Sequence, residues 1–129
     1  MTTEFDHDAF LGKQLHRRAV NGLHHFNNGE FFESHEELEA AWKDEPGPLR
    51  DLYRGILQVA VACYHLKRGN RIGAQKMLMR SRQWLAPFPD FVLGINVGQF
   101  RMEAQELETF LLNDADKMRI PIFKHIQFE

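Results

Sequence analysis

A histidine and several acids that could do chemistry lie close together in the stretch "FNNGEFFESHEELEAAW". At about 100° per residue, His35 falls near the centre of the apolar side of a helix, with Glu39 on its shoulder and Glu36 further round. Glu33 and Glu37 point outward on the same wheel. Only His35, Glu39 and Glu36 can therefore serve one site on this helix.

A second set of polar residues lies on the helix expected next, which is apolar nearly all round over "GILQVAVACY". Its large apolar residues share one side, whereas the polar residues Asp51, Arg54, Gln58 and His65 line the other side. Such a stripe is either exposed to solvent or one wall of a buried polar pocket. If the two helices pack along this wall, His35 and Glu39 face the last three of these polar side chains.

Three kinds of site follow from this arrangement. In the first, His35, Glu39 and His65 coordinate a divalent metal ion, and Glu36 is the catalytic base of a metal-assisted hydrolase. In the second, Glu39 orients His35 for metal-free acid/base work, and Arg54 holds a carboxylate or phosphate. In the third, the side chains satisfy one another as a network that fixes the helix packing. A lone histidine on an apolar stripe is more often structural, so the third interpretation ranks first.

Helices must position these residues, because the apolar spacing is helical rather than alternating. Breaks at Asn-Gly, Pro-Gly-Pro and Gly-Asn pairs separate five segments. The pattern predicts an all-α fold, a single-domain bundle of antiparallel helical hairpins that covers residues 1–129. The predicted helices span about Asp8–Asn27, Glu30–Asp44 and Leu49–Arg68, followed by one capped by Asn70 and one capped by Asn96.

Two of the hairpins look alike in sequence. Gly29 and Gly69 occupy equivalent places in "FNNGEFFESHEEL" and "LKRGNRIGAQKML", and Leu38 corresponds to Leu78. This suggests a tetratricopeptide-like duplication, but the usual period of that repeat is absent. Stacked helical hairpins are expected in either case.

The segments outside these hairpins are harder to assign. "APFPDFVLGI" reads as a loop that lies on the body of the protein. The tail "IPIFKHIQFE" cannot be helical across Pro121, so we expect it to be extended and docked. Docking would bury its large apolar residues, which are Ile120, Ile122, Phe123, Ile126 and Phe128.

Composition limits the partners and the compartment. A net charge of −2 gives no overall attraction to nucleic acid or to anionic membranes. The basic stretch 67–82 could still bind an anion or nucleic acid, an interpretation that ranks last. Cys63 is the single cysteine, and no apolar run is long enough to span a membrane, so we expect a cytoplasmic protein. A homo-oligomer formed through exposed apolar faces or the tail is a further expectation.

The two polar helices also carry a recognisable motif. Over about residues 22–85 the chain resembles the domain of unknown function 309 family, and 96–129 adds a helix and a tail. The resemblance implies a helical bundle of hairpins and no particular activity. We therefore predict a helical binding or scaffold module with a polar cluster between two hairpins. The cluster comprises His35, Glu36, Glu39, Trp42, Arg54, Gln58 and His65.

Overall fold

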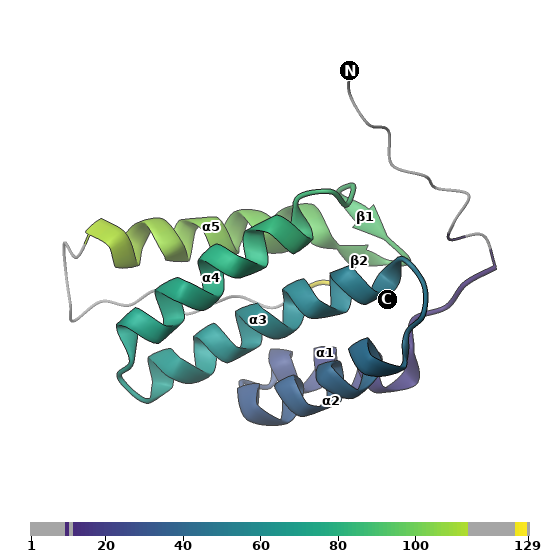
Figure 1. Cartoon of the computed structure of the whole chain (residues 1–129), viewed down its shortest axis with the longest axis horizontal. Coiled ribbons are helices and arrows are strands. Elements are labelled where there is room, and N and C mark those ends of the chain that lie inside the picture. The colour runs from purple at the N-terminus through teal and green to yellow at the C-terminus, as the bar shows by residue number, and fades with distance from the viewer. Residues whose placement is uncertain (1–9, 11, 114–125, 129) are drawn as a thin grey trace, which may run out of the picture.

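Five helices and one small β-hairpin make up the fold of the computed structural model, which describes residues 10, 12–113 and 126–128. The helices follow one another as stacked antiparallel neighbours, with α3 in the centre and α2 and α4 on either side (Figure 1). None of the helices in the described part is long and apolar enough to cross a membrane. The elements are α1 (Arg17–Asn27), α2 (Phe31–Asp44), α3 (Leu49–Lys67), α4 (Arg71–Leu85), β1 (Phe91–Val92), β2 (Ile95–Asn96) and α5 (Val97–Asn113).

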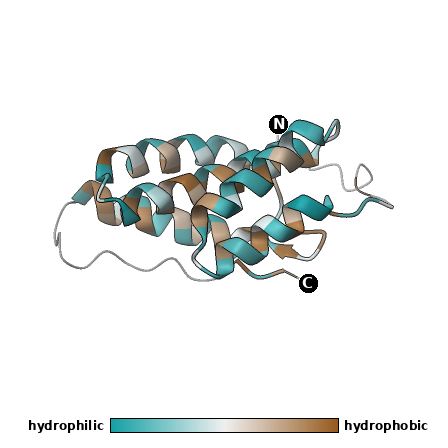
Figure 2. Cartoon of the chain, turned by 90° about the horizontal axis from the view of Figure 1, so that it is seen from below, coloured by the Kyte–Doolittle hydropathy of each residue, from teal (hydrophilic) through white to brown (hydrophobic). Residues whose placement is uncertain are grey.

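The all-α prediction is confirmed, and the central helix is the one that the sequence marks as apolar all round. Leu52, Ile56, Val59 and Ala60 of α3 are each at most 1% exposed. Figure 2 shows hydrophobic residues concentrated where the helices face one another, with hydrophilic residues along the outer sides. The core is therefore continuous from α1 through α3 to α5.

The first predicted helix is too long, because α1 begins only at Arg17. Gly12 has φ +74°, and residues 13–16 are not helical. The His16 side chain accepts a hydrogen bond from the Arg18 N–H (3.1 Å), and the His16 N–H donates to the Tyr53 hydroxyl (2.8 Å). The chain thus leaves the helical path at His16, which caps α1.

Two further segments refine the prediction. The stretch expected to be a loop contains the antiparallel pair β1–β2, with Val92 opposite Ile95 across a turn at Leu93 and Gly94. These strands have two residues each, too short for an alternating pattern to appear in the sequence. The predicted cap of α5 is confirmed, since the Asn96 Oδ1 accepts from the Gln99 N–H at 3.1 Å.

The docked tail is confirmed for the residues that the structure describes. Ile126 is 1% exposed, and Phe128 packs against the core. The other apolar residues of the predicted tail, Ile120, Ile122 and Phe123, lie outside the described residues. Docking therefore rests on the segment 126–128.

Candidate functional site

Helices α3 and α4 are in close contact at Gly55. A Cβ atom at this position would lie 2.6 Å from Leu85 Cδ2 and 3.3 Å from the Cβ of Trp84. Only a residue without a side chain leaves room for this contact. The close approach brings Trp84 of α4 over the surface of α3.

The guanidinium of Arg54 lies between two indole rings. Its Cζ is 5.2 Å from the ring centroid of Trp42 on α2 and 4.2 Å from that of Trp84 on α4. Arg50 stands over the Trp42 ring as well, at 5.4 Å. Arginine stacks well on aromatic faces because its planar cation is weakly hydrated. One side chain of α3 thus ties together the helices on both its sides, and it does so with both tryptophans of the chain.

Two polar atoms beside this stack lack a hydrogen-bond partner. They are the Oε1 of Gln58, one helical turn after Arg54, and the indole Nε1 of Trp84. Gln58 is 8% exposed, so its amide lies just beneath the surface. A buried polar group without a partner costs about 1–3 kcal/mol, so a ligand group that displaced the side chains covering these atoms would gain by pairing with them.

His35 and Glu39 form a chain of charges along α2 rather than a buried centre. His35 Nε2 lies 3.1 Å from Glu39 Oε2, and the other oxygen of Glu39 lies 3.0 Å from Lys43 Nζ. The hydrogen bond from Lys43 lowers the pKa of Glu39, with a smaller contribution from the charge of His35. The His35 and Glu39 side chains are about one-third exposed, so this part of the predicted cluster is a half-exposed ridge.

The helix wheel misplaced the centre of α2, because this helix packs against both α1 and α3. Ser34 is fully buried instead of His35, and its hydroxyl donates to the carbonyl of Gly22 at 2.7 Å. Glu37 does not point away from the protein as predicted, since it pairs with Arg18 of α1 at 2.9 Å. A helix with two neighbours buries a broad face, and a small polar residue can lie at its centre.

The three predicted metal ligands do not come together. Across residues 10, 12–113 and 126–128, no group of three or more His, Cys, Asp or Glu side chains is placed to hold a metal ion. His65 lies at the end of α3, where its Nδ1 is 3.4 Å from the amide nitrogen of Asn70. Glu36, the candidate base, is exposed on α2. His35 and Glu39 are thus the only two of the three predicted ligands that make contact.

Much of the basic stretch 67–82 serves the fold. Lys67 Nζ donates to the carbonyl of Gly29 at 2.7 Å, Arg68 donates to the Tyr64 hydroxyl at 2.9 Å, and Arg82 pairs with Glu108 at 2.9 Å. Lys76 and Arg80 are exposed and pair with no carboxylate of the described residues.

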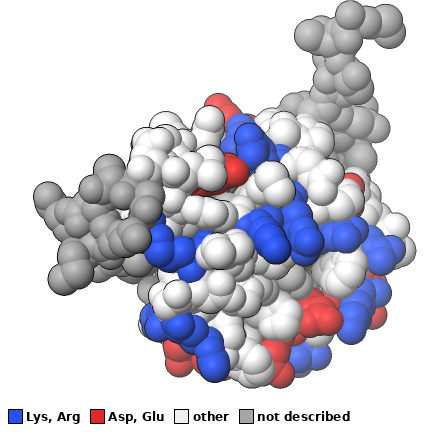
Figure 3. All heavy atoms as spheres, turned by 60° about the vertical axis from the view of Figure 1, so that its left-hand side comes forward, with Lys and Arg blue, Asp and Glu red and all other residues white. Residues whose placement is uncertain are grey.

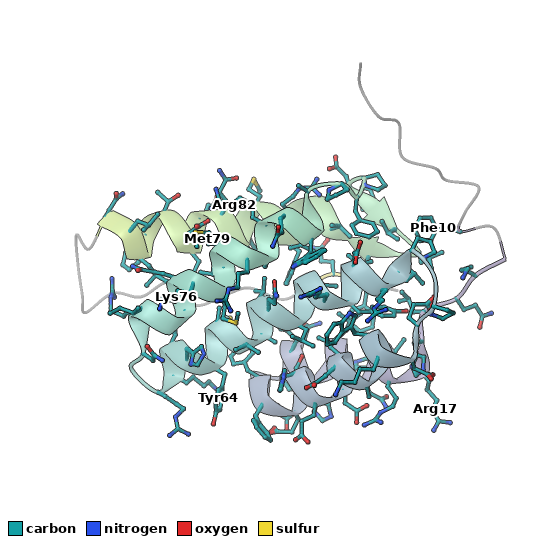
Figure 4. All side chains as sticks on the ribbon, viewed as in Figure 1. Phe10, Arg17, Tyr64, Lys76, Met79 and Arg82 are labelled. Atoms are coloured by element: carbon teal, nitrogen blue, oxygen red, sulfur yellow. The ribbon has the colours of Figure 1, made fainter. Side chains whose placement is uncertain are left out.

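These two cations belong to the same side of the molecule as the stack. Lys76, Arg80 and Trp84 follow one another at a spacing of four on α4, so they share one face. Figure 4 shows Lys76 projecting from α4 beside α3, and Figure 3 shows Lys and Arg side chains gathered in a band across the molecule. This side of the protein is therefore basic although the whole chain is acidic.

The α1–α4 region matches a known family. Residues 19–77 match the family described as Domain of unknown function (DUF309). This part of the chain is therefore similar to that family. The match includes Trp42, Arg54 and Gln58, whereas Trp84 lies beyond it.

The chain spans only part of the length of the relatives that it matches. The chain is 32% identical over 85 residues to an uncharacterized protein of Aquifex aeolicus (strain VF5), which covers 64% of this chain and 25% of that protein. It is 43% identical over 53 residues to the uncharacterized protein YpuF of Bacillus subtilis (strain 168), covering 40% of this chain and 30% of YpuF. The matched region thus spans about a quarter to a third of these relatives.

Proposed function

We propose that this protein is a cytoplasmic binding module, and that the surface formed by α2, α3 and α4 receives an acidic segment of a protein partner. The observation that carries the proposal is the Arg54 guanidinium, which is stacked between Trp42 and Trp84 and has no carboxylate partner among the described residues. A half-buried cation is normally paired, because partial desolvation costs free energy. The two rings hold this cation ready for an anionic group.

The unpaired atoms favour a peptide over a simple anion. A ligand carboxylate can accept from Arg54 and from the Trp84 indole N–H. The oxygen of Gln58 needs a donor, which a peptide N–H supplies and a phosphate diester lacks. The exposed cations Lys76 and Arg80 extend the positive charge along α4, so an acidic segment is attracted over more than one turn.

Two acids flank this surface: Asp51 is exposed on α3, three residues before Arg54, and Glu39 is already paired. Glu39, the acid that faces α3 on the shoulder of α2, is held by Lys43 and His35. The Lys43–Glu39 pair thereby keeps one edge of the surface close to neutral. In this proposal the predicted cluster acts as a binding surface, and His35, Glu39 and Lys43 form its border.

The proposal is tested with a labelled glutamate oligopeptide as the probe. Fluorescence of Trp42 and Trp84 reports on this surface directly, because the chain has no other tryptophan. We expect the peptide to change this fluorescence and the Arg54→Gln substitution to weaken binding about tenfold, the loss of one charge-assisted contact. Arg17→Gln is the matched control, since Arg17 is an exposed arginine on α1 and, unlike Arg50 and Arg54, does not stand over either indole ring.

Two results would contradict the proposal. One is equal affinity of the Arg54→Gln and wild-type proteins for the peptide. The other is tighter binding of a single-stranded oligonucleotide with a steep salt dependence, which would favour nucleic acid as the ligand. A glutamine oligopeptide of the same length controls for contacts that do not depend on charge.

A further inference from the structure

A second binding arrangement involves the segment 126–128, which lies beside β2 and α1. The Asn27 side chain binds the backbone of Ile126 on both sides of the residue. Its Nδ2 donates to the Ile126 carbonyl at 2.9 Å, and its Oδ1 accepts from the Ile126 N–H at 2.8 Å. The Asn96 N–H donates to the Gln127 carbonyl at 2.9 Å. In Figure 1 this segment is the short yellow trace near β2.

Side chains add selectivity to these backbone contacts. Ile126 is 1% exposed, whereas Gln127 is exposed between its two neighbours. The Phe128 ring packs against the core and meets the His24 ring edge-on, with ring centroids 4.9 Å apart. The residues at positions one and three are therefore selected by burial, whereas Gln127 stays exposed and its Oε1 accepts a hydrogen bond from Asn96 Nδ2 at 3.3 Å.

This is how proteins recognise extended peptides. Main-chain hydrogen bonds provide affinity, and pockets for alternate side chains provide specificity. The groups that receive the segment come from α1 and β2, and 99 positions separate Asn27 from Ile126. The receiving residue Asn27 lies inside the DUF309 match, and the bound segment lies outside it. None of the three backbone bonds requires the bound segment to belong to the same chain.

We propose that Asn27 and Asn96 form a recognition site for an extended Ile-x-Phe segment, and that residues 126–128 of a second copy of this chain can occupy it. In the single chain the site is filled by its own segment. Exchange of an identical segment between two copies keeps every contact described above and creates no new ones. The second copy is the partner that fits best, because its segment has the side chains that the site already binds.

A peptide competition tests this site in the full chain. The probe is a fluorescent peptide with the sequence IFKHIQFE, which corresponds to residues 122–129. Wild-type protein should bind it weakly, because a tethered segment competes at an effective concentration in the millimolar range. Ile126→Asp removes the resident side chain, so this variant should bind the peptide at least tenfold more tightly than wild type. A peptide with serine at both apolar positions of Ile-x-Phe is the control.

A second substitution ties the result to the site. Adding Asn27→Ala to Ile126→Asp should abolish the gain in affinity, while the exposed substitution Asn113→Ala should leave it unchanged. If Ile126→Asp loses its helical circular dichroism, Ile126→Ala replaces it, with the same expectation of a gain over wild type. A folded variant that binds the peptide no better than wild type would overturn the proposal, as would a gain that survives Asn27→Ala.

The second-copy part has its own measurement. Light scattering after size-exclusion chromatography should show a dimer of the wild-type chain that increases with concentration. Ile126→Asp and Asn27→Ala should each reduce it at least tenfold. Wild-type protein that stays monomeric up to millimolar concentration would overturn exchange between copies, and a dimer unaffected by both substitutions would do the same.

Discussion

The α1–α2 hairpin and the α3–α4 hairpin share the same turn. Gly29 has φ +77° and Gly69 has φ +76°, and each glycine N–H binds the carbonyl three residues earlier at 3.0 Å. The next residue donates to a histidine carbonyl in both hairpins, Glu30 to His25 at 2.9 Å and Asn70 to His65 at 2.8 Å. This is the Schellman arrangement, in which a left-handed residue ends the helix. The two turns therefore repeat in detail, 40 positions apart.

The two hairpins differ in the length of their first helix. Helix α1 has 11 residues and α3 has 19, so α3 carries about two additional turns at its start. These turns hold Arg54 and Gly55, which place the tryptophan stack. The repeated part builds the frame of the fold, whereas Arg54, the central cation of the candidate binding surface, stands on the part that is not repeated.

The largest expected effect tests whether equivalent core residues of the two hairpins contribute equally to the free energy of unfolding. Leu38 and Leu78 occupy equivalent positions and are 0% and 2% exposed. We expect Leu38→Ala and Leu78→Ala each to lower the free energy of unfolding by about 2–5 kcal/mol, because both leave a cavity in the core. Urea denaturation measures both. A nearly neutral result at either position would break the equivalence of the hairpins.

Alanine substitutions at two close helix contacts should distinguish a residue that affects stability alone from one that also affects the tryptophan stack. A Cβ atom at Gly22 would lie 2.7 Å from Leu38 Cγ. A Cβ atom at Gly55 would lie 2.6 Å from Leu85 Cδ2. Gly22→Ala and Gly55→Ala should each destabilise the protein by about 1–3 kcal/mol through overpacking. Only Gly55→Ala should alter tryptophan fluorescence, because it displaces Trp84 from Arg54. An equal spectral change in Gly22→Ala would remove this distinction.

Alkaline pH should lower the free energy of unfolding through a residue that only the second hairpin has, Cys63. Cys63 stands where the first hairpin has Leu23, and burial raises the pKa of its thiol from an ordinary 9.0 to about 12. The unfolded chain therefore loses this proton first. The contribution of Cys63 to the free energy of unfolding is fully present below pH 9. It falls by about 1.4 kcal/mol per pH unit between pH 9 and about 12.

The Cys63→Ala variant isolates this contribution. Its free energy of unfolding should decline less steeply over the same range than that of wild type. Tyr53 is present in both proteins, and burial raises its pKa as well, so its effect cancels in the difference. Parallel pH profiles for the two proteins would contradict the assignment to Cys63.

The smallest expected effect concerns an ion pair that only the first hairpin has. Arg18 and Glu37 meet at 2.9 Å, whereas the corresponding positions of the second hairpin hold Gln58 and Met77. Glu37→Gln should cost about 0.2–1 kcal/mol at neutral pH, since solvent reaches the half-exposed Arg18 side chain and screens the pair. The hydrogen bond from Arg18 lowers the pKa of Glu37 below 4.5, so this contribution is lost as the pH falls through that range.

A double-mutant cycle with Arg18→Gln measures the pair directly. Glu33→Gln is the matched control, because Glu33 is an exposed acid of the same helix. A coupling energy above about 2 kcal/mol would show that the pair is more than a surface contact.

The sequence predicts the parts of the fold that depend on residues close together in the chain. Gly29, Gly69, Asn70 and Asn96 mark turns and caps, and all four occupy those places. The start of α1 could not be read in this way, because His16 is an uncommon cap and its other partner, Tyr53, lies 37 positions away. Local patterns fail where a distant residue decides the backbone path.

The candidate site was predicted only in part for a similar reason. Periodicity identified Arg54 and Gln58 on one side of α3, and it placed Trp42 on the facing helix. Periodicity could not predict that Trp84 also lies at this site, because the contact at Gly55 sets how α4 is rotated against α3. A glycine inside an apolar helix was the available signal, since such a residue marks a close approach of a neighbouring element.

The clamp between Asn27 and Ile126 has a consequence for the order of folding. Each hairpin forms from contacts close in sequence, whereas this clamp closes a loop of 99 positions. Long loops cost more chain entropy to close and slow the contacts that depend on them. During synthesis α1 to α4 can be complete before residue 126 is made. We therefore expect newly made chains to pass through a stage in which the hairpins are folded and the receiving site is empty.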